Sequence, residues 1–184
     1  AARIARAGWK EASEIAILSA GMDKNLVDAL AAAPLAKLKN APILLTQGDV
    51  LNTYAEGELK RLGVKTVYVT AGEQVITNKV LAPFAELKIN VVPLGGKDRF
   101  ETAVNIAKEI GSFNKMVVAT ARSNADALSI SSIAAAKGMA ILLSEAGKIP
   151  TQVKNYIDSI GSNVNQTYIL GGEGVLADAV KNAV

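Results

Sequence analysis

Cysteine and histidine are both absent from the 184-residue chain. Without them the protein has no thiol nucleophile, no disulfide, no zinc site of the usual kind and no imidazole to act as a general base near neutral pH. These absences exclude many enzyme mechanisms. We therefore expect no catalytic residue, no metal site and no cofactor.

Aromatic residues, long apolar runs and clusters of basic charge are also scarce. Aromatic side chains make up 4% of the sequence, too few for a platform on which sugars or unpaired bases stack. The purely apolar runs have the length of strands, well short of the ~20 residues that cross a bilayer, and no signal peptide opens the chain. The net charge of +3 is spread along the sequence. We expect neither nucleic-acid binding nor membrane insertion.

Half of the residues are apolar, enough for a buried core, and their order repeats. The repeated landmarks are Asp-Ala-Leu at 28–30 and 126–128, Ile-Leu-Leu at 43–45 and 141–143, and the segments 68–73 and 168–173. Their offsets are 98, 98 and 100 residues, in the same order along the chain. A near-constant offset indicates a duplicated unit. We divide the chain into a first unit, residues 1–90, and a second unit, residues 91–184.

The phase of the duplication indicates that the chain begins inside a repeat. Residues 1–6, AARIAR, resemble residues 103–108, AVNIAK. The segment 95–102 then has no counterpart in the first unit. We expect a longer natural protein in which that counterpart precedes residue 1.

Short apolar segments alternate with longer segments of helical periodicity, which is the pattern of βαβ construction around a parallel sheet. The predicted fold class is α/β. The expected strands are 14–19, 42–46, 66–70, 90–94, 115–119, 139–144 and 167–170. The expected helices are 27–38, 51–62, 77–87, 99–110, 125–137, 149–160 and 175–183. Pro34 and Pro83 fall inside two of these helices and should kink or interrupt them.

Four blocks of the sequence carry a family resemblance. They are GKDRFETA at 96–103, DALAAAPLA at 28–36, APILLT at 41–46 and YILGGE at 168–173. In these blocks the chain resembles the type 2 cell-wall-binding repeats of clostridial surface-layer and wall-anchored proteins. The resemblance implies tandem Toprim-like or Rossmann-like βα repeats with parallel sheets, which assemble in threes. It also implies an exported, extracellular protein of the Gram-positive cell wall, held without covalent attachment by an anionic secondary wall polymer.

Arg99 is the leading candidate for polymer binding. Its guanidinium can hold a phosphate or carboxylate through two hydrogen bonds, and it follows a Gly-Gly pair at a predicted helix start. Alternatively, Asp98 and Glu101 pair with Arg99 and fix the turn. The two roles are compatible, and Asp98 is then a residue of the polymer site that orients the guanidinium of Arg99. Lys97 and Arg122 flank loops at the expected carboxyl ends of strands, where parallel sheets bind ligands, or they are simply solvated.

Asp28 and Asp126 occupy matching places at helix starts in the two units. This recurrence predicts a polar site repeated by symmetry or, as the stronger interpretation, two carboxylates that cap their helices. The pairs Gly95-Gly96 and Gly171-Gly172 predict tight turns rather than phosphate cradles, because neither has the spacing of a nucleotide-binding loop. The serines within 129–132 predict close packing at a module interface, since no histidine exists to activate a serine.

The leading hypothesis is a non-catalytic anchoring module that binds an anionic wall polymer. One alternative is a Rossmann-like enzyme that uses a nucleotide or sugar phosphate, which would need a deep pocket of convergent carboxylates with shifted pKa values. Another alternative is a surface-layer module that only self-assembles. Because two units cannot close a pseudo-three-fold ring, further copies of the repeat, in the same or another chain, are expected partners.

Overall fold

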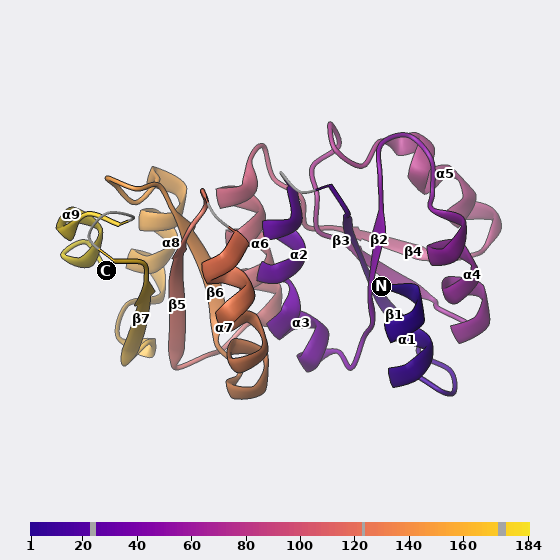
Figure 1. The fold of residues 1–184 in the computed structure, drawn as a ribbon, viewed down its shortest axis with the longest axis horizontal. Coiled ribbons are helices and arrows are strands. Elements are labelled where there is room, and N and C mark those ends of the chain that lie inside the picture. The colour runs from indigo at the N-terminus through magenta and orange to yellow at the C-terminus, as the bar shows by residue number, and fades with distance from the viewer. Residues whose placement is uncertain (23–24, 123, 173–175) are drawn as a thin grey trace.

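The computed structural model describes residues 1–22, 25–122, 124–172 and 176–184, and it contains two α/β units side by side (Figure 1). Each unit has a central parallel sheet with helices packed on it. The first unit forms the indigo and magenta end of the molecule, and the second forms the orange and yellow end. The predicted α/β class with parallel sheets is confirmed, while the Toprim-like assignment stays a prediction.

The strands of the two sheets follow the same order. The first sheet has the order β2-β1-β3-β4 and the second has the order β6-β5-β7. The strands of the first sheet are β1 (Ile15–Ala20), β2 (Ile43–Thr46), β3 (Thr66–Val69) and β4 (Asn90–Pro93). Those of the second are β5 (Lys115–Thr120), β6 (Ala140–Ser144) and β7 (Gln166–Leu170). Every predicted strand is present, with its ends moved by no more than one residue.

Helices connect the strands and flank both sheets. The helices of the first unit are α1 (Ala2–Gly8), α2 (Leu26–Ala31), α3 (Ala33–Leu38), α4 (Thr53–Leu62) and α5 (Asn78–Glu86). Those of the second are α6 (Arg99–Ile110), α7 (Asn124–Lys137), α8 (Thr151–Ile160) and α9 (Asp178–Lys181), with a 3₁₀ turn at Gly161–Asn163. The predicted helix over 175–183 starts at a residue outside the described ranges, and its described part is helical only in α9.

The two prolines have different effects. The residues predicted as one helix over 27–38 form α2 and α3, and Pro34 lies in the first turn of α3, where its missing N–H costs no intrahelical bond. Pro83 lies inside α5, which continues through it, so the predicted interruption there is wrong. The N–H lost at Pro83 would have bonded to the carbonyl of Lys79. Because Lys79 is exposed, water can replace that bond.

The pairing register shows the duplication directly. Ile17 of β1 pairs with Ile43 of β2, and the equivalent Val117 of β5 pairs with Ile141 of β6. The strand β4 pairs with β3, so the expected division between residues 90 and 91 falls inside a strand of the first sheet. The two sheets therefore divide after Pro93.

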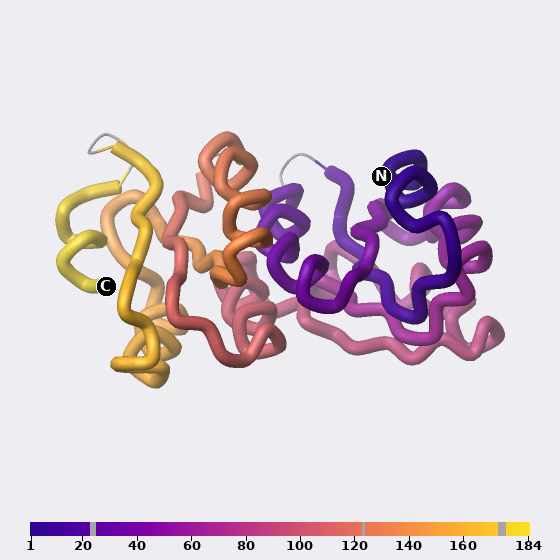
Figure 2. Tube along the Cα trace, turned by 90° about the horizontal axis from the view of Figure 1, so that it is seen from below, coloured from indigo at the N-terminus to yellow at the C-terminus, as the bar shows by residue number. Residues whose placement is uncertain are grey.

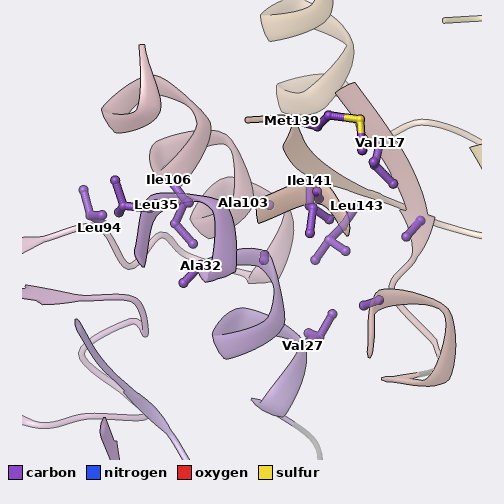
Figure 3. Close-up of a cluster of buried hydrophobic side chains, with 14 of the residues drawn as sticks. Val27, Ala32, Leu35, Leu94, Ala103, Ile106, Val117, Met139, Ile141 and Leu143 are labelled. Carbon is purple, nitrogen blue, oxygen red and sulfur yellow. The ribbon is translucent and has the colours of Figure 1, made fainter. Parts of the chain in front are cut away.

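A shared hydrophobic core joins the two units. Helices α2 and α3 of the first unit lie against α7 of the second, as Figure 2 shows from a second direction. In Figure 3, Leu35 of α3 lies close to Ile106 of α6, and Ile141 of the second sheet belongs to the same buried cluster. Small residues such as Ala32 and Ala134 are fully buried here and let the helices approach closely. This common core fixes the orientation of one unit against the other.

The carboxylate of Glu58 on α4 ties α1 to the first unit. Its side chain is 2% exposed and accepts from Arg6 at 2.7 Å and from Arg61 at 2.7 Å. Arg61 also donates to the carbonyl of Trp9 at 2.9 Å. The hydrogen bonds from Arg61 and, after it, Arg6 hold the pKa of Glu58 below its ordinary value, although burial acts in the opposite direction.

Candidate functional site

A cavity of about 590 Å³ opens at the junction of the two units. It lies beyond the carboxyl ends of β3 and β4, between the loops that follow these strands, the first turns of α6 and the start of α2. Ligands of parallel sheets bind at this end of the strands, so the location suits a binding site. The polar residues that line the cavity are Asn25, Asp28, Glu73, Gln74, Lys97, Asp98, Arg99, Glu101, Thr102 and Asn105.

Glycines let the two loops of the cavity touch. A Cβ atom on Gly95 would stand 2.1 Å from the carbonyl oxygen of Ala71, and one on Gly72 would stand 2.6 Å from the carbonyl oxygen of Gly96. Any larger residue at Gly95 would push the loop after β4 away from the loop after β3. The glycines at 72 and 95 are needed because the two backbones pass so close together, and the tight turn at Gly95-Gly96 stays a prediction.

The first turn of α6 is held by reciprocal capping. Asp98 is the N-cap residue and its carboxylate accepts the N–H of Glu101 at 2.8 Å, while the Glu101 carboxylate accepts the N–H of Lys97 at 2.7 Å. Asp98 also accepts from the amide of Gln152 on α8, at 3.0 and 3.2 Å. Both acidic neighbours of Arg99 are thus engaged in fixing the helix start through backbone N–H groups.

Arg99 extends from this helix start toward the loop after β5, in the same unit. It is half-buried, and its Nη1 donates to the carbonyl of Ala121, directly after β5, at 2.8 Å. Its positive charge also acts on Asp28 of α2, whose pKa it lowers. The guanidinium therefore sits in the cavity wall between an acidic group of the first unit and a loop of the second.

Asp28 is the most perturbed group in the cavity wall. Asp28 is only 5% exposed, and its buried Oδ1 has no hydrogen-bond partner among the described residues. Burial raises the pKa of Asp28 to about 7; the Arg99 guanidinium opposes that rise and the Asp98 carboxylate adds to it. Asp28 lies in the first turn of α2 and lines the cavity; no hydrogen bond from a backbone N–H of the described residues to its carboxylate is found, and its capping role stays a prediction.

The predicted site residues are only partly brought together. Asp28, Lys97, Asp98 and Arg99 line the cavity. Arg122 is exposed and lies outside the cavity wall, with its backbone N–H bonded to Thr120 Oγ1 at 3.2 Å. Asp126 lies half-buried in the first turn of α7 and also outside the wall. The repeat places Asp126 as Asp28 is placed, but Asp126 does not line this cavity.

Six of the polar lining residues were not among the predicted site residues, and for two of them, Glu73 and Asn105, the sequence held a usable signal. Glu73 ends one of the repeated segments, so the repeat itself marked its loop. Asn105 lies on α6 and donates its amide to the carbonyl of Leu94 at 3.2 Å. Its spacing of seven residues from Asp98 places both on one face of the helix, and helical periodicity could have identified it.

The described residues hold neither a cluster of metal ligands nor a membrane-spanning helix. They contain no group of three or more acidic side chains arranged to hold a metal ion. Within the same residues, no helix is long and apolar enough to cross a bilayer.

The sequence matches the family described as cell wall binding domain 2 (CWB2) over residues 1–81 and 94–181. The two matched segments fall on the two structural units. Two proteins of Bacillus subtilis (strain 168) are similar: an amidase enhancer, 31% identical over 96% of this chain and 23% of its own length, and the N-acetylmuramoyl-L-alanine amidase LytC, 31% identical over 84% of this chain and 31% of its own.

Solved structures agree with the sequence match. Cwp6 from Clostridium difficile superposes with a TM-score of 0.90 at 30% identity, over 99% of this chain and 29% of that one. Cwp8 from the same organism gives a TM-score of 0.87 at 29% identity, over 99% of this chain and 31% of that one. The chain spans less than a third of each of these four relatives. Since the family match covers both units, the chain belongs to the cell wall binding domain 2 family and is a module of the bacterial cell wall and surface.

Proposed function

We propose that the chain is a non-catalytic anchoring module, which binds an anionic secondary polymer of the Gram-positive cell wall and so holds an exported protein there without a covalent bond. The observation that supports this most directly is the position of Arg99. Its guanidinium lies in the wall of a cavity, at the start of a helix, where backbone N–H groups and the helix dipole favour negative charge. A phosphate or carboxylate of a polymer suits that place.

The charges around the cavity restrict how an anion can bind. Lys97 and Arg99 are its cationic side chains, and four carboxyl groups accompany them: those of Asp28, Glu73, Asp98 and Glu101. Two of the four, at Asp98 and Glu101, already accept backbone N–H groups in the cap of α6. An anion would therefore bind on the side of Arg99 and Lys97, and the carboxyl groups of Asp28 and Glu73, which take no part in the cap of α6, would oppose it.

An apolar face of the molecule supports the assembly of further repeats. A groove of about 420 Å³ runs between α1, α2, α3 and β2 and is lined by side chains such as Ile4, Trp9 and Leu30, together with Ser131 of α7. Nearby on α7, Leu128 is 62% exposed. Exposed apolar surface of this kind marks a contact between proteins. In our proposal a further copy of the repeat, from the same or another chain, packs here and completes a pseudo-three-fold assembly.

Repeated junctions would make the anchoring multivalent. Each cavity would hold the polymer weakly through salt-sensitive contacts. Several cavities on one polymer raise the effective concentration, and the combined affinity can exceed that of one site by about a hundredfold.

One observation favours an enzyme as the second candidate. The cavity contains a carboxyl group with a raised pKa, Asp28, as an acid catalyst would require. An acid–base pair would need a second carboxylate; Asp98 and Glu101 are used to cap α6, and Glu73 of the loop after β3 is the other carboxylate of the described cavity wall. Release of soluble products from cell walls separates this candidate from the anchoring function.

The test is co-sedimentation of the chain with purified Bacillus subtilis cell walls, before and after acid extraction of the secondary polymers, over a series of salt concentrations. Arg99→Ala is the test variant and Arg122→Ala is its control, because Arg122 is exposed and lies outside the cavity. A hydrogen bond to a charged group contributes about 1.5–3 kcal/mol, so we expect Arg99→Ala to weaken binding by roughly 10- to 100-fold. Arg122→Ala should bind like the wild type.

Three results would count against the proposal. Binding that survives extraction of the polymers would contradict an anionic polymer as the ligand. Equal binding by both arginine variants would place the site elsewhere on the molecule. Release of soluble sugars or peptides from the walls by the wild type, but not by Asp28→Asn, would establish the enzyme instead.

A further inference from the structure

We propose that the cavity binds its anionic group together with one proton, which Asp28 holds, so that attachment to the wall strengthens as the surroundings become more acidic. This inference rests on the proposed function, because it concerns the regulation of the same cavity. It makes the protonation of Asp28 the condition for an anion to bind at Arg99.

The first support is geometric. Asp28 lines the cavity from α2, yet it is only 5% exposed, and within the part of the chain that the structure describes its Oδ1 has no hydrogen-bond partner. A buried carboxyl oxygen without a partner carries the full cost of its lost hydration. The cost is smaller when the group is a neutral acid, and the hydroxyl of that acid can donate to an oxygen of a bound ligand. A ligand in the cavity would thus provide the partner that Oδ1 lacks.

The second support is the arrangement of charges around Asp28. From α6 and the loop before it, Lys97 and Arg99 are positive, whereas Asp98 and Glu101 are negative; from the loop after β3, Glu73 is negative. No charged residue of α3, α7 or β1 belongs to the described cavity wall. Among these groups, the Arg99 guanidinium lowers the pKa of Asp28 and the Asp98 carboxylate raises it, while burial outweighs both and leaves the value at about 7.

These charges couple proton and anion. When Asp28 is ionised, the cavity wall has one more negative charge beside Arg99, and an arriving anion is repelled by it. When Asp28 is protonated, that charge is gone and the field of Arg99 acts on the ligand instead. If only the protonated form binds, a group that titrates near pH 7 makes binding about tenfold tighter at pH 6 than at pH 8.

The experiment measures wall binding against pH with matched variants. The chain, Asp28→Asn and Asp126→Asn are each sedimented with Bacillus subtilis cell walls between pH 5.5 and pH 8.5 at constant ionic strength. Asp126 is the control because it is the repeat equivalent of Asp28 and lies outside the cavity wall. We expect the wild type and Asp126→Asn to bind about tenfold more tightly at pH 6 than at pH 8. The binding of Asp28→Asn should not change with pH, because its amide cannot ionise.

A second measurement does not depend on the walls or on the folding of a variant. Aspartate labelled with ¹³C at the carboxyl carbon reports the protonation of Asp28 in the wild-type chain by NMR, and we expect a midpoint close to pH 7. A midpoint below pH 5 overturns the inference. Equal pH dependence in the wild type and Asp28→Asn, or none in either, also overturns it while the proposed function stands. Failure of every variant to bind at any pH overturns both.

Discussion

Replacing Asp28 by asparagine should stabilise the protein at neutral and alkaline pH and leave its stability at acid pH nearly unchanged. The side chain keeps its shape, and only the ability to ionise is lost. In the folded chain the pKa of Asp28 is raised from 3.8 to about 7 by burial, against the attraction of Arg99 and with the repulsion of Asp98. The folded state therefore binds a proton over a range of pH in which the unfolded chain has released it.

The sign and size follow from this difference. The stability contributed by Asp28 is fully present below about pH 4 and is lost as the pH rises to about 7. Between these values the unfolded chain has already released the proton, which lowers its free energy, whereas the folded chain still holds it. A shift of about 3 pKa units, at ~1.4 kcal/mol each, corresponds to about 4 kcal/mol. Other groups that titrate contribute equally to the wild type and the variant, so their effects cancel in the comparison.

Urea unfolding of the two proteins at pH 4, 6 and 8, followed by circular dichroism and by the fluorescence of Trp9, measures the difference. The free energy of unfolding of Asp28→Asn should exceed that of the wild type by about 4 kcal/mol at pH 8 and by close to zero at pH 4. A difference that stays constant over this range would show that Asp28 does not carry a proton in the folded protein, and the account of the cavity given above would be refuted.

Two further substitutions test how the structure is held together. Gly95→Ala should lower the free energy of unfolding by about 2 kcal/mol or more, because its Cβ would meet the Ala71 carbonyl oxygen at 2.1 Å. Its control is Gly57→Ala on the exposed side of α4, where a Cβ meets nothing and should stabilise the protein by about 0.5–1 kcal/mol. Thermal unfolding checks both, and equal effects would contradict the close contact of the loops. Glu58→Gln should lower the free energy of unfolding by about 2 kcal/mol at pH 7, because the ionic contacts with Arg61 and Arg6 are lost. The arginines hold the pKa of Glu58 below its ordinary value, so this cost should disappear as the pH falls below 4.5 and Glu58 takes up a proton. A cost that is the same at pH 3 would disprove the ionic contribution.

The fold was largely accessible from the sequence because its determinants are local. Runs such as Ile43 to Leu45 are apolar over most of the length of one strand, and the turn residues that follow Thr46 end it. Pro34 divided its helix as expected, since a proline near a helix start acts through its own backbone. Pro83 differed because the carbonyl it leaves unpaired is on an exposed turn, and exposure is a property of the tertiary structure.

The site was accessible only in part, and Asp28 shows why. The repeat identified Asp28 and Asp126 as equivalent, and a carboxylate in the first turn of a helix is ordinarily a cap. What distinguishes Asp28 is its burial against Arg99 and Asp98, about seventy residues further along the chain. No local pattern reports that proximity, whereas Arg99 and its neighbours formed one contiguous block and could be recognised directly.

The cavity is divided between two units, each of which supplies one side of it. The first unit on its own would hold the carboxyl of Asp28 without Arg99, and the second on its own would hold Arg99 without Asp28. In a row of such units the number of complete cavities is one fewer than the number of units, whereas in a closed ring the two numbers are equal. Removing one unit from a ring of three would then leave one cavity instead of three, so the capacity of the assembly would fall more steeply than its mass.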